Sequence, residues 1–344
     1  MRLSQKGEDG TINYQAKNLT INNGISYTEV RQIALDIFKY NFLEMQHEAK
    51  SIAQERAEEI TETFLKRMVD EYPEGMQLAN TPDFQYSLYL VQKQYARYGD
   101  EELGHLLVDL LVNRTKYDNR SIIQIVLNES LEVVSRLTIE QISVLSIIFV
   151  FKYCKASVNS LDDLYHLFDK YFKPLAGSLA KSLICYQHLE YAGCGQDKGS
   201  GEFFGTLLSE KYGGLFSKGI ELEEFSLEEI SPMMIDKYFD ASTRDEDKFQ
   251  LSAISWRNFE RDNNDSLIKE DSDKIFRLYM DSKLTDIEIE EEVIQKCEFM
   301  KKVIDIWNNS TMRKFELTSV GIAIGHANMK KTIGSFEDLS TWIS

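Results

Sequence analysis

The sequence predicts a mainly α-helical protein with a short β segment at its amino end. Apolar residues recur at helical spacing over most of the 344 residues, and only four prolines interrupt the chain. Leu, Ile, Glu and Lys, which favour helices, are abundant. Hydrophobic residues make up 43% of the chain and aromatic residues 11%, so a sizeable core is expected, and the length allows two compact domains or one domain with appendages.

Residues 7–24, GEDGTINYQAKNLTINNG, alternate between apolar and polar side chains as a β-strand does. The alternation changes phase at Asn18, which tolerates a left-handed turn, so two short strands are expected. Because a two-stranded unit is marginal alone in water, we expect residues 1–25 to be an oligomerisation tag that pairs with copies of itself. The pairing residues are Ile12, Tyr14, Ala16, Leu19 and Ile21. The alternative is an edge strand folded back onto its own chain.

Residues 26–72 predict one long amphipathic helix. Ser26 and Glu29 have the S-x-x-E spacing of a capping box, and no proline occurs before Pro73. If continuous, the helix would be about 65 Å long, a length that suits packing along a partner helix. Copies of this helix are expected to meet along a seam formed by Ile33, Ile37, Met45 and Ile52.

The remainder predicts a helical domain over residues 83–230 and a second helical region over residues 231–344. Five segments of the first domain carry apolar residues at helical spacing, with glycine- and asparagine-containing turns between them. Glycine clusters in residues 192–219 indicate loops, and a short strand is expected within residues 203–216. Residues 273–307 are expected to be helical again.

The segment from Phe315 to Met329 resembles the strand-to-helix junction of winged-helix domains. Phe315–Leu317 predicts a strand and Thr318 the N-cap of a helix, in which Gly321 and Gly325 would allow close packing. A winged helix could bind nucleic acid through the flanking cations Arg313, Lys314, Lys330 and Lys331. The net charge of −17 and the lack of an Arg/Asn/Gln-rich recognition helix argue against this, because phosphate neutralisation dominates such binding.

Two groups of side chains have the spacing of metal ligands: Cys185, His188 and Cys194, and Glu101, His105 and Asp109. Structural zinc normally needs four ligands, so buried cysteines beside an incidental histidine are the simpler interpretation of the first group. The second group would share one helix face, where ion-pair ladders are common. The glycine-rich loop has no Walker ending. No catalytic residue, metal site or cofactor is therefore predicted.

Composition also bears on location. Four cysteines without a pairing pattern suit a reducing cytoplasm better than a disulfide framework. The first ten residues lack the apolar core of a signal peptide. The longest apolar run, Val144–Val150, is much shorter than the roughly 20 residues of a membrane span. We expect a cytoplasmic protein without a membrane span.

Two family resemblances add context. The opening QKGEDGTINYQAKNLTINNGISYTEVRQIALDIFKYNF resembles the amino-terminal segment of an uncharacterised bacterial family and the β tags of bacterial defence-associated proteins. GDEELGHLLVDLLVNRT, IVLNESLEVVSRLTIEQISVLSIIFVF and FELTSVGIAIGHAN resemble the Abi-alpha proteins, which are associated with abortive phage infection. The second resemblance departs from the family pattern at Gln141, Ile142 and Ile324. It implies a role in antiphage defence and assigns no catalytic residues.

The predicted function is that of a non-enzymatic, self-assembling bacterial protein, linked to antiphage defence or abortive infection. It would form a homo-oligomer and act through contacts with its own copies, another protein or a phage protein. The alternative is a nucleic-acid-binding sensor that uses the winged-helix-like element. A metal-dependent hydrolase would require stoichiometric zinc.

Overall fold

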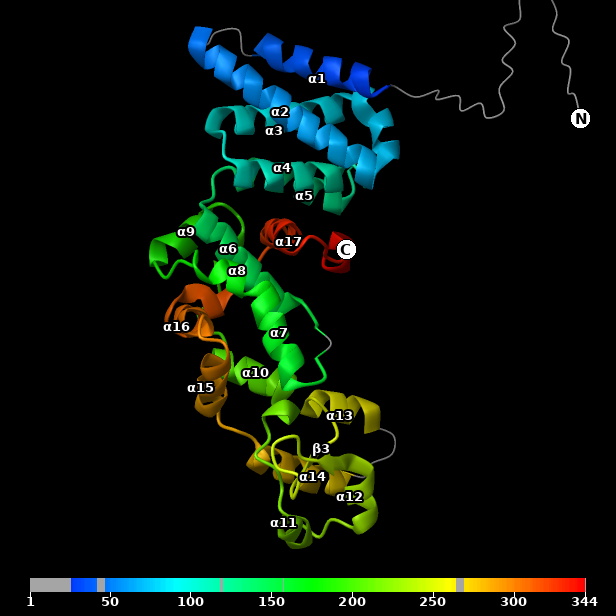
Figure 1. Ribbon diagram of the computed structural model, residues 1–344, viewed down its shortest axis with the longest axis vertical. Helices are drawn as coiled ribbons and strands as arrows, with labels where there is room; N and C mark the ends of the chain where they lie inside the picture. The colour runs from blue at the N-terminus through cyan, green and yellow to red at the C-terminus, as the bar shows by residue number, and fades with distance from the viewer. Residues whose placement is uncertain (1–25, 42–46, 118–119, 157, 264–268, 344) are drawn as a thin grey trace, which may run out of the picture. The chain divides into compact units, whose positions relative to one another are not determined.

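The computed structural model describes residues 26–41, 47–117, 120–156, 158–263 and 269–343. The chain divides into two compact units, Met1–Ala96 and Arg97–Ser344. Helices dominate both units, and the strands among the described residues form two antiparallel sheets of two strands each (Figure 1). The mainly α fold class is therefore confirmed. The predicted β tag in residues 1–25 lies outside the described residues.

The first unit consists of α1 (Tyr27–Asn41), α2 (His47–Glu71), η1 (Pro73–Asn80) and α3 (Pro82–Tyr98), most of which belongs to this unit. The capping box forms as predicted, because Glu29 Oε2 accepts from the Ser26 amide at 2.8 Å and Ser26 Oγ from the Glu29 amide at 3.3 Å. One continuous helix over residues 26–72 is wrong. α1 and α2 pack side by side, and Arg31 Nη2 lies 2.8 Å from Glu62 Oε1. In a continuous helix these residues would be about 46 Å apart.

A buried cluster explains why the two helices fold back on each other. It is formed by Phe38, Ala53, Ala57 and Ala96, whose mostly small side chains let the helices approach closely. Gln92 joins the three helices, since its Nε2 donates to the Ala34 carbonyl at 3.2 Å and to Thr61 Oγ1 at 2.9 Å. Burying both apolar faces within one chain removes more apolar surface from water than an isolated rod would.

The hairpin breaks up the predicted interhelical seam. Ile33 and Ile37 are half-buried on α1, whereas Ile52 is 44% exposed on α2. Met45 lies outside the described residues. Because the described seam residues fall on two helices that turn back on each other, they do not form one continuous stripe along a rod.

The second unit begins with a set of helices, and those over residues 101–171 match four of the five predicted segments. The set consists of α4 (Glu101–Arg114), α5 (Ile122–Val134), α6 (Ile139–Ile148), the π-helical turn η2 (Phe149–Tyr153), α7 (Leu161–Tyr171), α8 (Lys173–Ala176) and α9 (Leu183–Tyr191). Near the carboxyl end of the chain, α17 (Ser319–Ile333) packs against α4, α5 and α6 and is buried from Val320 to Met329. It is therefore the central helix of this bundle (Figure 1).

The strand–cap–helix element forms where it was predicted. β4 (Phe315–Leu317) pairs with β1 (Gly195–Asp197) in antiparallel register, with Gly195 opposite Leu317. Thr318 Oγ1 then accepts from the Gly321 amide at 3.2 Å and caps α17. The strand expected within residues 203–216 is wrong, since this segment forms α10 (Phe204–Tyr212) and η3 (Gly213–Phe216). Phe204 and Leu208, spaced four apart, are both fully buried, which fixes the helical period.

Residues 217–284 form an insertion with a core of its own. It contains α11 (Leu222–Leu227), α12 (Pro232–Tyr238), β2 (Phe239–Ala241), β3 (Phe249–Leu251), α13 (Trp256–Asn263) and α14 (Lys269–Ser282). Its two ends meet, because the Lys218 amide donates to the Ser282 carbonyl at 2.6 Å. The predicted boundary between residues 230 and 231 runs through this core, where the Phe225 and Phe239 rings lie 4.8 Å apart.

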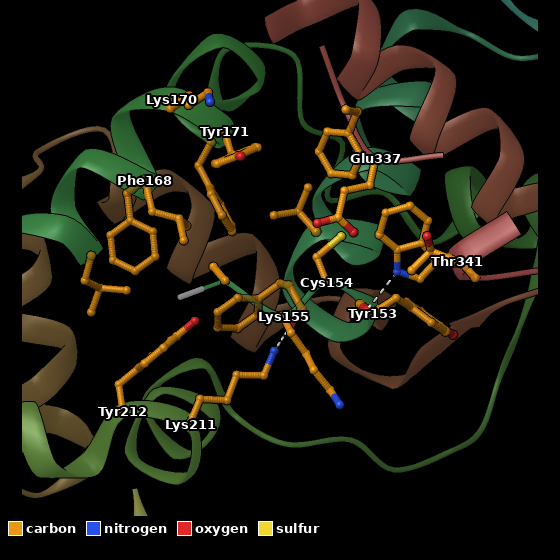
Figure 2. A pocket seen from close by; sticks show the side chains of 18 of the residues that line it. Tyr153, Cys154, Lys155, Phe168, Lys170, Tyr171, Lys211, Tyr212, Glu337 and Thr341 are labelled. Atoms are coloured by element: carbon orange, nitrogen blue, oxygen red, sulfur yellow. Dashed lines mark hydrogen bonds between the residues drawn. The ribbon is translucent and has the colours of Figure 1, made fainter. Parts of the chain in front are cut away.

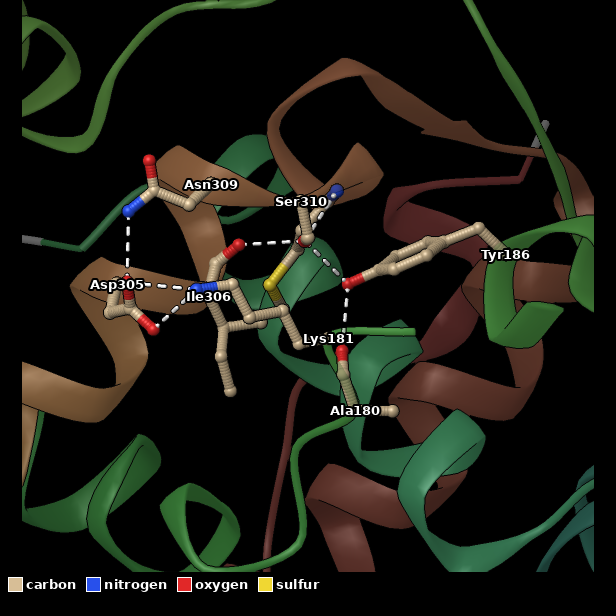
Figure 3. Close-up of polar contacts among 8 residues, drawn as sticks. Ala180, Lys181, Tyr186, Asp305, Ile306, Asn309 and Ser310 are labelled. Atoms are coloured by element: carbon tan, nitrogen blue, oxygen red, sulfur yellow. Dashed lines mark hydrogen bonds and ion pairs between the residues drawn. The ribbon is translucent and has the colours of Figure 1, made fainter. Parts of the chain in front are cut away.

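The chain then returns to the main body through α15 (Asp286–Lys296), α16 (Met300–Asn309) and η4 (Thr311–Lys314), and ends after η5 (Leu339–Thr341). A polar network ties α16 to the segment that precedes α9 (Figure 3). Tyr186 Oη donates to the Ala180 carbonyl at 3.0 Å and lies 2.9 Å from Ser310 Oγ, while Lys181 Nζ lies 2.9 Å from Asp305 Oδ2. None of the described helices has the length and hydrophobicity required to span a bilayer.

Candidate functional site

The four cations considered for nucleic-acid binding flank the β4–α17 element. Three of them are engaged within the chain: Lys330 pairs with Asp109, Lys331 pairs with Glu102, and Arg313 donates to the Gly201 carbonyl. Lys314 is half-buried. Because α17 is buried along ten consecutive residues, it cannot lie in a DNA groove as a recognition helix does without leaving the bundle.

The two groups with metal-ligand spacing, which the sequence analysis discounted, do not assemble. Asp109 is 1% exposed and lies 3.0 Å from Lys330 Nζ, whereas Glu101 and His105 are exposed. In the other group, His188 Nδ1 is in hydrogen-bonding contact with the Gln141 side chain, 2.9 Å from its Nε2. Burial raises the pKa of Cys185 to about 11 and that of Cys194 to about 12, which disfavours the thiolates that zinc requires. Over the described ranges, no three acidic, histidine or cysteine side chains are grouped for a metal ion.

A cleft in the second unit, which sequence analysis missed, has the dimensions of a binding site (Figure 2). We call it the η2 cleft. Its volume is about 790 Å³, and it is lined by η2 and the residues after it, α7, the end of α10, and residues 335–342. Its lining comes from four stretches of sequence that no spacing pattern connects.

The π-helical turn supplies one wall of the cleft and is held open by side chains. Lys211 Nζ, from α10, donates to the Phe151 carbonyl (Figure 2). Lys152 Nζ points elsewhere and donates to the carbonyls of Arg313 at 2.7 Å and Phe315 at 3.0 Å. Trp342 Nε1 donates to the Tyr153 carbonyl at 3.1 Å. Single π turns occur frequently at functional sites because the widened turn leaves backbone groups to be bonded from outside the helix.

Positive charge gathers in the η2 cleft, although the chain as a whole carries −17. Lys155, Lys170 and Lys211 line it, whereas Glu337 is the acidic residue among the described lining. Burial lowers the pKa of Lys211. The carboxylate of Glu337 is directed toward Cys154 rather than toward Lys211 (Figure 2). Burial chiefly raises the pKa of Cys154 to about 12, so the neighbouring thiol is neutral.

Aromatic rings form the other part of the lining. Tyr171 comes from α7, Tyr212 from the end of α10, and Phe336 and Trp342 from the carboxy-terminal segment. The Phe336 ring centroid lies 5.6 Å from that of Trp342 and 6.1 Å from that of Tyr171. Figure 2 shows the Tyr212 hydroxyl directed into the cleft. The arrangement therefore offers apolar ring surface beside cationic groups.

Comparison with protein families gives one assignment. A family model described only as "-like" matches residues 24–343. This chain belongs to that family. The description names no activity, ligand or partner, and the match begins just after the strand-like segment at the amino end. No curated protein and no solved structure matches the chain significantly.

Proposed function

We propose that this chain is a non-enzymatic, self-associating bacterial protein that acts through protein contacts in antiphage defence of the abortive-infection type. The observation that carries the proposal is the exposed apolar face of α9. Leu183, Ile184 and Tyr191 are 59%, 73% and 88% exposed on this nine-residue helix. Clusters of large apolar side chains in contact with water are typical of protein-interaction surfaces.

The buried side of α9 lies against the start of α6, which leaves the opposite side exposed. Gln141 Nε2 donates to the Cys185 carbonyl at 3.0 Å, so the two helices meet there. We take a second copy of this chain as the occupant of the α9 face, in line with the self-association expected of residues 1–25. The net charge of −17 on each copy opposes this association, so the apolar contact has to outweigh that repulsion.

Residues 1–25 are the second contact in the proposed assembly. Their apolar set is Ile12, Tyr14, Ala16, Leu19 and Ile21. Burying each large side chain is worth roughly 1.5–3 kcal/mol, whereas ordering each residue costs about 1–2 kcal/mol. Such a segment is stabilised most when the strands of several copies pair edge to edge and bury their apolar side chains in one core. The family match begins at residue 24, which supports an appended element. Since α1 and α2 form a hairpin, the proposal does not use a seam along them.

The biological setting rests on the resemblance to Abi-alpha proteins, and the partner beyond the assembly would be a phage or host protein. All four cysteines are free, which supports a reducing cytoplasm. The internal pairing of Lys330, Lys331 and Arg313 gives no support to the nucleic-acid alternative.

Light scattering of the full-length chain tests the proposal. We expect a mass above that of the monomer at micromolar concentration, a lower mass for a Δ1–25 deletion, and a lower mass for an Ile184→Ser/Tyr191→Ser variant. The matched control is Leu227→Ser/Met233→Ser, because these residues are 81% and 79% exposed but lie in the insertion. A monomeric full-length chain contradicts self-association. A deletion without effect contradicts pairing through residues 1–25, and an unchanged mass of the Ile184→Ser/Tyr191→Ser variant contradicts the α9 contact.

A phage challenge of cells that carry the gene tests the setting separately. Fewer plaques are expected with the natural chain and with the control variant, and normal plaque numbers with Δ1–25. A chain that assembles in solution but gives no protection would contradict the defence role while leaving self-association in place.

A further inference from the structure

The η2 cleft has the size and fixed walls of a small-molecule site. Its volume of about 790 Å³ falls within the roughly 300–1,000 Å³ of ligand pockets. The carboxy-terminal wall is anchored at two points. Trp342 Nε1 donates to the Tyr153 carbonyl at 3.1 Å, and His326 Nε2 lies 2.7 Å from the Glu337 carbonyl oxygen. The cleft is therefore formed without a ligand.

The ammonium group of Lys211 is the feature that indicates an anionic ligand. It is half-buried, donates to the Phe151 carbonyl, lies 5.2 Å from the centroid of the Phe151 ring, and forms no ion pair among the described residues. Buried charges are normally paired, because a desolvated ammonium without a counter-charge is costly. An ammonium has three N–H donors, and the Phe151 carbonyl takes one of them. An anion in the cleft would supply the missing charge and accept from the remaining donors.

A second cation stands near the same stretch of chain. Lys155 follows Phe151 by four residues, is exposed, and makes no ion pair within the described part of the chain. Lys170, by contrast, has its Nζ over the Tyr171 ring, 5.2 Å from the centroid. Lys155 can therefore turn toward an anion held at Lys211 without giving up an existing partner.

The lining rings define the rest of the ligand. Tyr171, Tyr212 and Trp342 reach the cleft from three separate elements. Aromatic side chains stack on planar heterocycles, and this stacking contributes binding free energy without base-specific hydrogen bonds. A simple inorganic anion would leave this ring surface unused.

We propose that the η2 cleft binds a nucleoside phosphate, with the phosphate at Lys211 and Lys155 and the base among the rings of Tyr171, Tyr212 and Trp342. The ligand class follows from the combination of an ammonium without an ion pair among the described residues, aromatic walls and a volume suited to a nucleotide. Binding at this cleft does not depend on self-association, and it would let a small molecule act on the main helical body.

Fluorescence titration of the full-length chain tests the proposal, because Trp342 lines the cleft whereas Trp307 is fully buried. The probes are the four common ribonucleoside 5′-monophosphates, with the matching nucleosides and inorganic phosphate as separate arms. At least one monophosphate is expected to quench the fluorescence saturably, and its nucleoside and phosphate alone to bind at least tenfold more weakly. Trp342→Phe should remove the quenching and also reduce the binding heat measured by calorimetry, because it removes the Nε1 bond to the Tyr153 carbonyl that anchors this wall.

Substitutions locate the site. Lys211→Met is expected to weaken binding by about tenfold or more, because it removes a charge-assisted hydrogen bond. Lys155→Met, at an exposed position that does not endanger folding, is expected to weaken it by a smaller factor. The matched control is Lys301→Met, an exposed lysine on α16 outside the cleft, which should bind as the natural chain does. The proposal is overturned if no monophosphate binds at millimolar concentration, if phosphate alone binds equally well, or if neither cleft lysine matters.

Discussion

Gly321 on the central helix α17 is a position where the packing leaves no room for a single methyl group. A Cβ atom built there would lie 1.9 Å from the Cys194 carbonyl oxygen. That oxygen cannot move freely, because it accepts from the Thr318 amide at 3.1 Å where β4 passes into α17. Gly321→Ala must therefore displace backbone on one side of the contact.

The magnitude follows from two opposing effects. Overpacking a core typically costs about 1–3 kcal/mol, and a clash with a hydrogen-bonded backbone atom belongs at the upper end. Alanine in place of glycine inside a helix returns about 1 kcal/mol. The net loss of unfolding free energy is therefore about 2 kcal/mol, which corresponds to a fall in Tm of roughly 4–8 °C for a unit of this size.

Gly325 provides the matched control one turn further along α17. A Cβ atom there would lie 3.0 Å from the Leu145 carbonyl oxygen and 3.1 Å from Phe149 Cβ, so small movements accommodate it. Urea unfolding of Gly321→Ala and Gly325→Ala should show a lowered midpoint for the first and a nearly unchanged midpoint for the second. If Gly321→Ala is as stable as the natural chain, the close approach of α17 to Cys194 is wrong.

Three further predictions concern caps and charges. Thr318→Ala removes the N-cap of α17 and should cost about 1 kcal/mol in urea unfolding, with Thr318→Ser restoring most of it. Asp109→Asn removes the carboxylate that pairs with Lys330 and should cost about 3 kcal/mol; an Asp109→Asn/Lys330→Met double variant that is no more stable than the single one would contradict the pairing. Glu288 has its pKa lowered from about 4.5 to about 2, first by the Thr285 amide in the capping box of α15. Because the folded pKa is depressed, this stabilisation is present above about pH 4.5 and lost toward pH 2, so the stability gap between the natural chain and Glu288→Gln should close over that range.

Several helices of the second unit could be predicted because they combine an internal apolar period with a local start signal. Ser121, Thr138 and Ser160 each accept from a backbone amide of the first turn of α5, α6 or α7. These signals act within a few residues, so the sequence alone contains them. The strand at residues 315–317 and the cap at Thr318 were predictable for the same reason.

The α1–α2 hairpin could not be predicted in this way. Residues 26–72 contain neither proline nor glycine, and the apolar spacing continues through them. The reversal follows from tertiary packing. Phe38 packs with Ala53 and Ala57, and the Gln92 side chain donates hydrogen bonds to both α1 and α2. The spacing of apolar residues shows which face of a helix is apolar. It does not show whether that face packs against a copy of the chain or against the next helix.

The η2 cleft shows the same difficulty at the level of a site. Residues 144–151, VLSIIFVF, read as an ordinary buried helix, and the periodicity gives no sign of a π turn. Two lysines, Lys152 and Lys211, bond to backbone carbonyls at or near that turn. Both are half-buried and form no ion pair within the described chain, yet their surroundings differ. Lys152 has two backbone carbonyls at 2.7 and 3.0 Å, which satisfy it in a structural role. Lys211 has one carbonyl and faces the cleft, so its remaining hydrogen-bonding capacity and its charge are directed where a ligand can enter. That difference, which depends on backbone positions from distant segments, is the reason for placing the proposed phosphate at Lys211 rather than at Lys152.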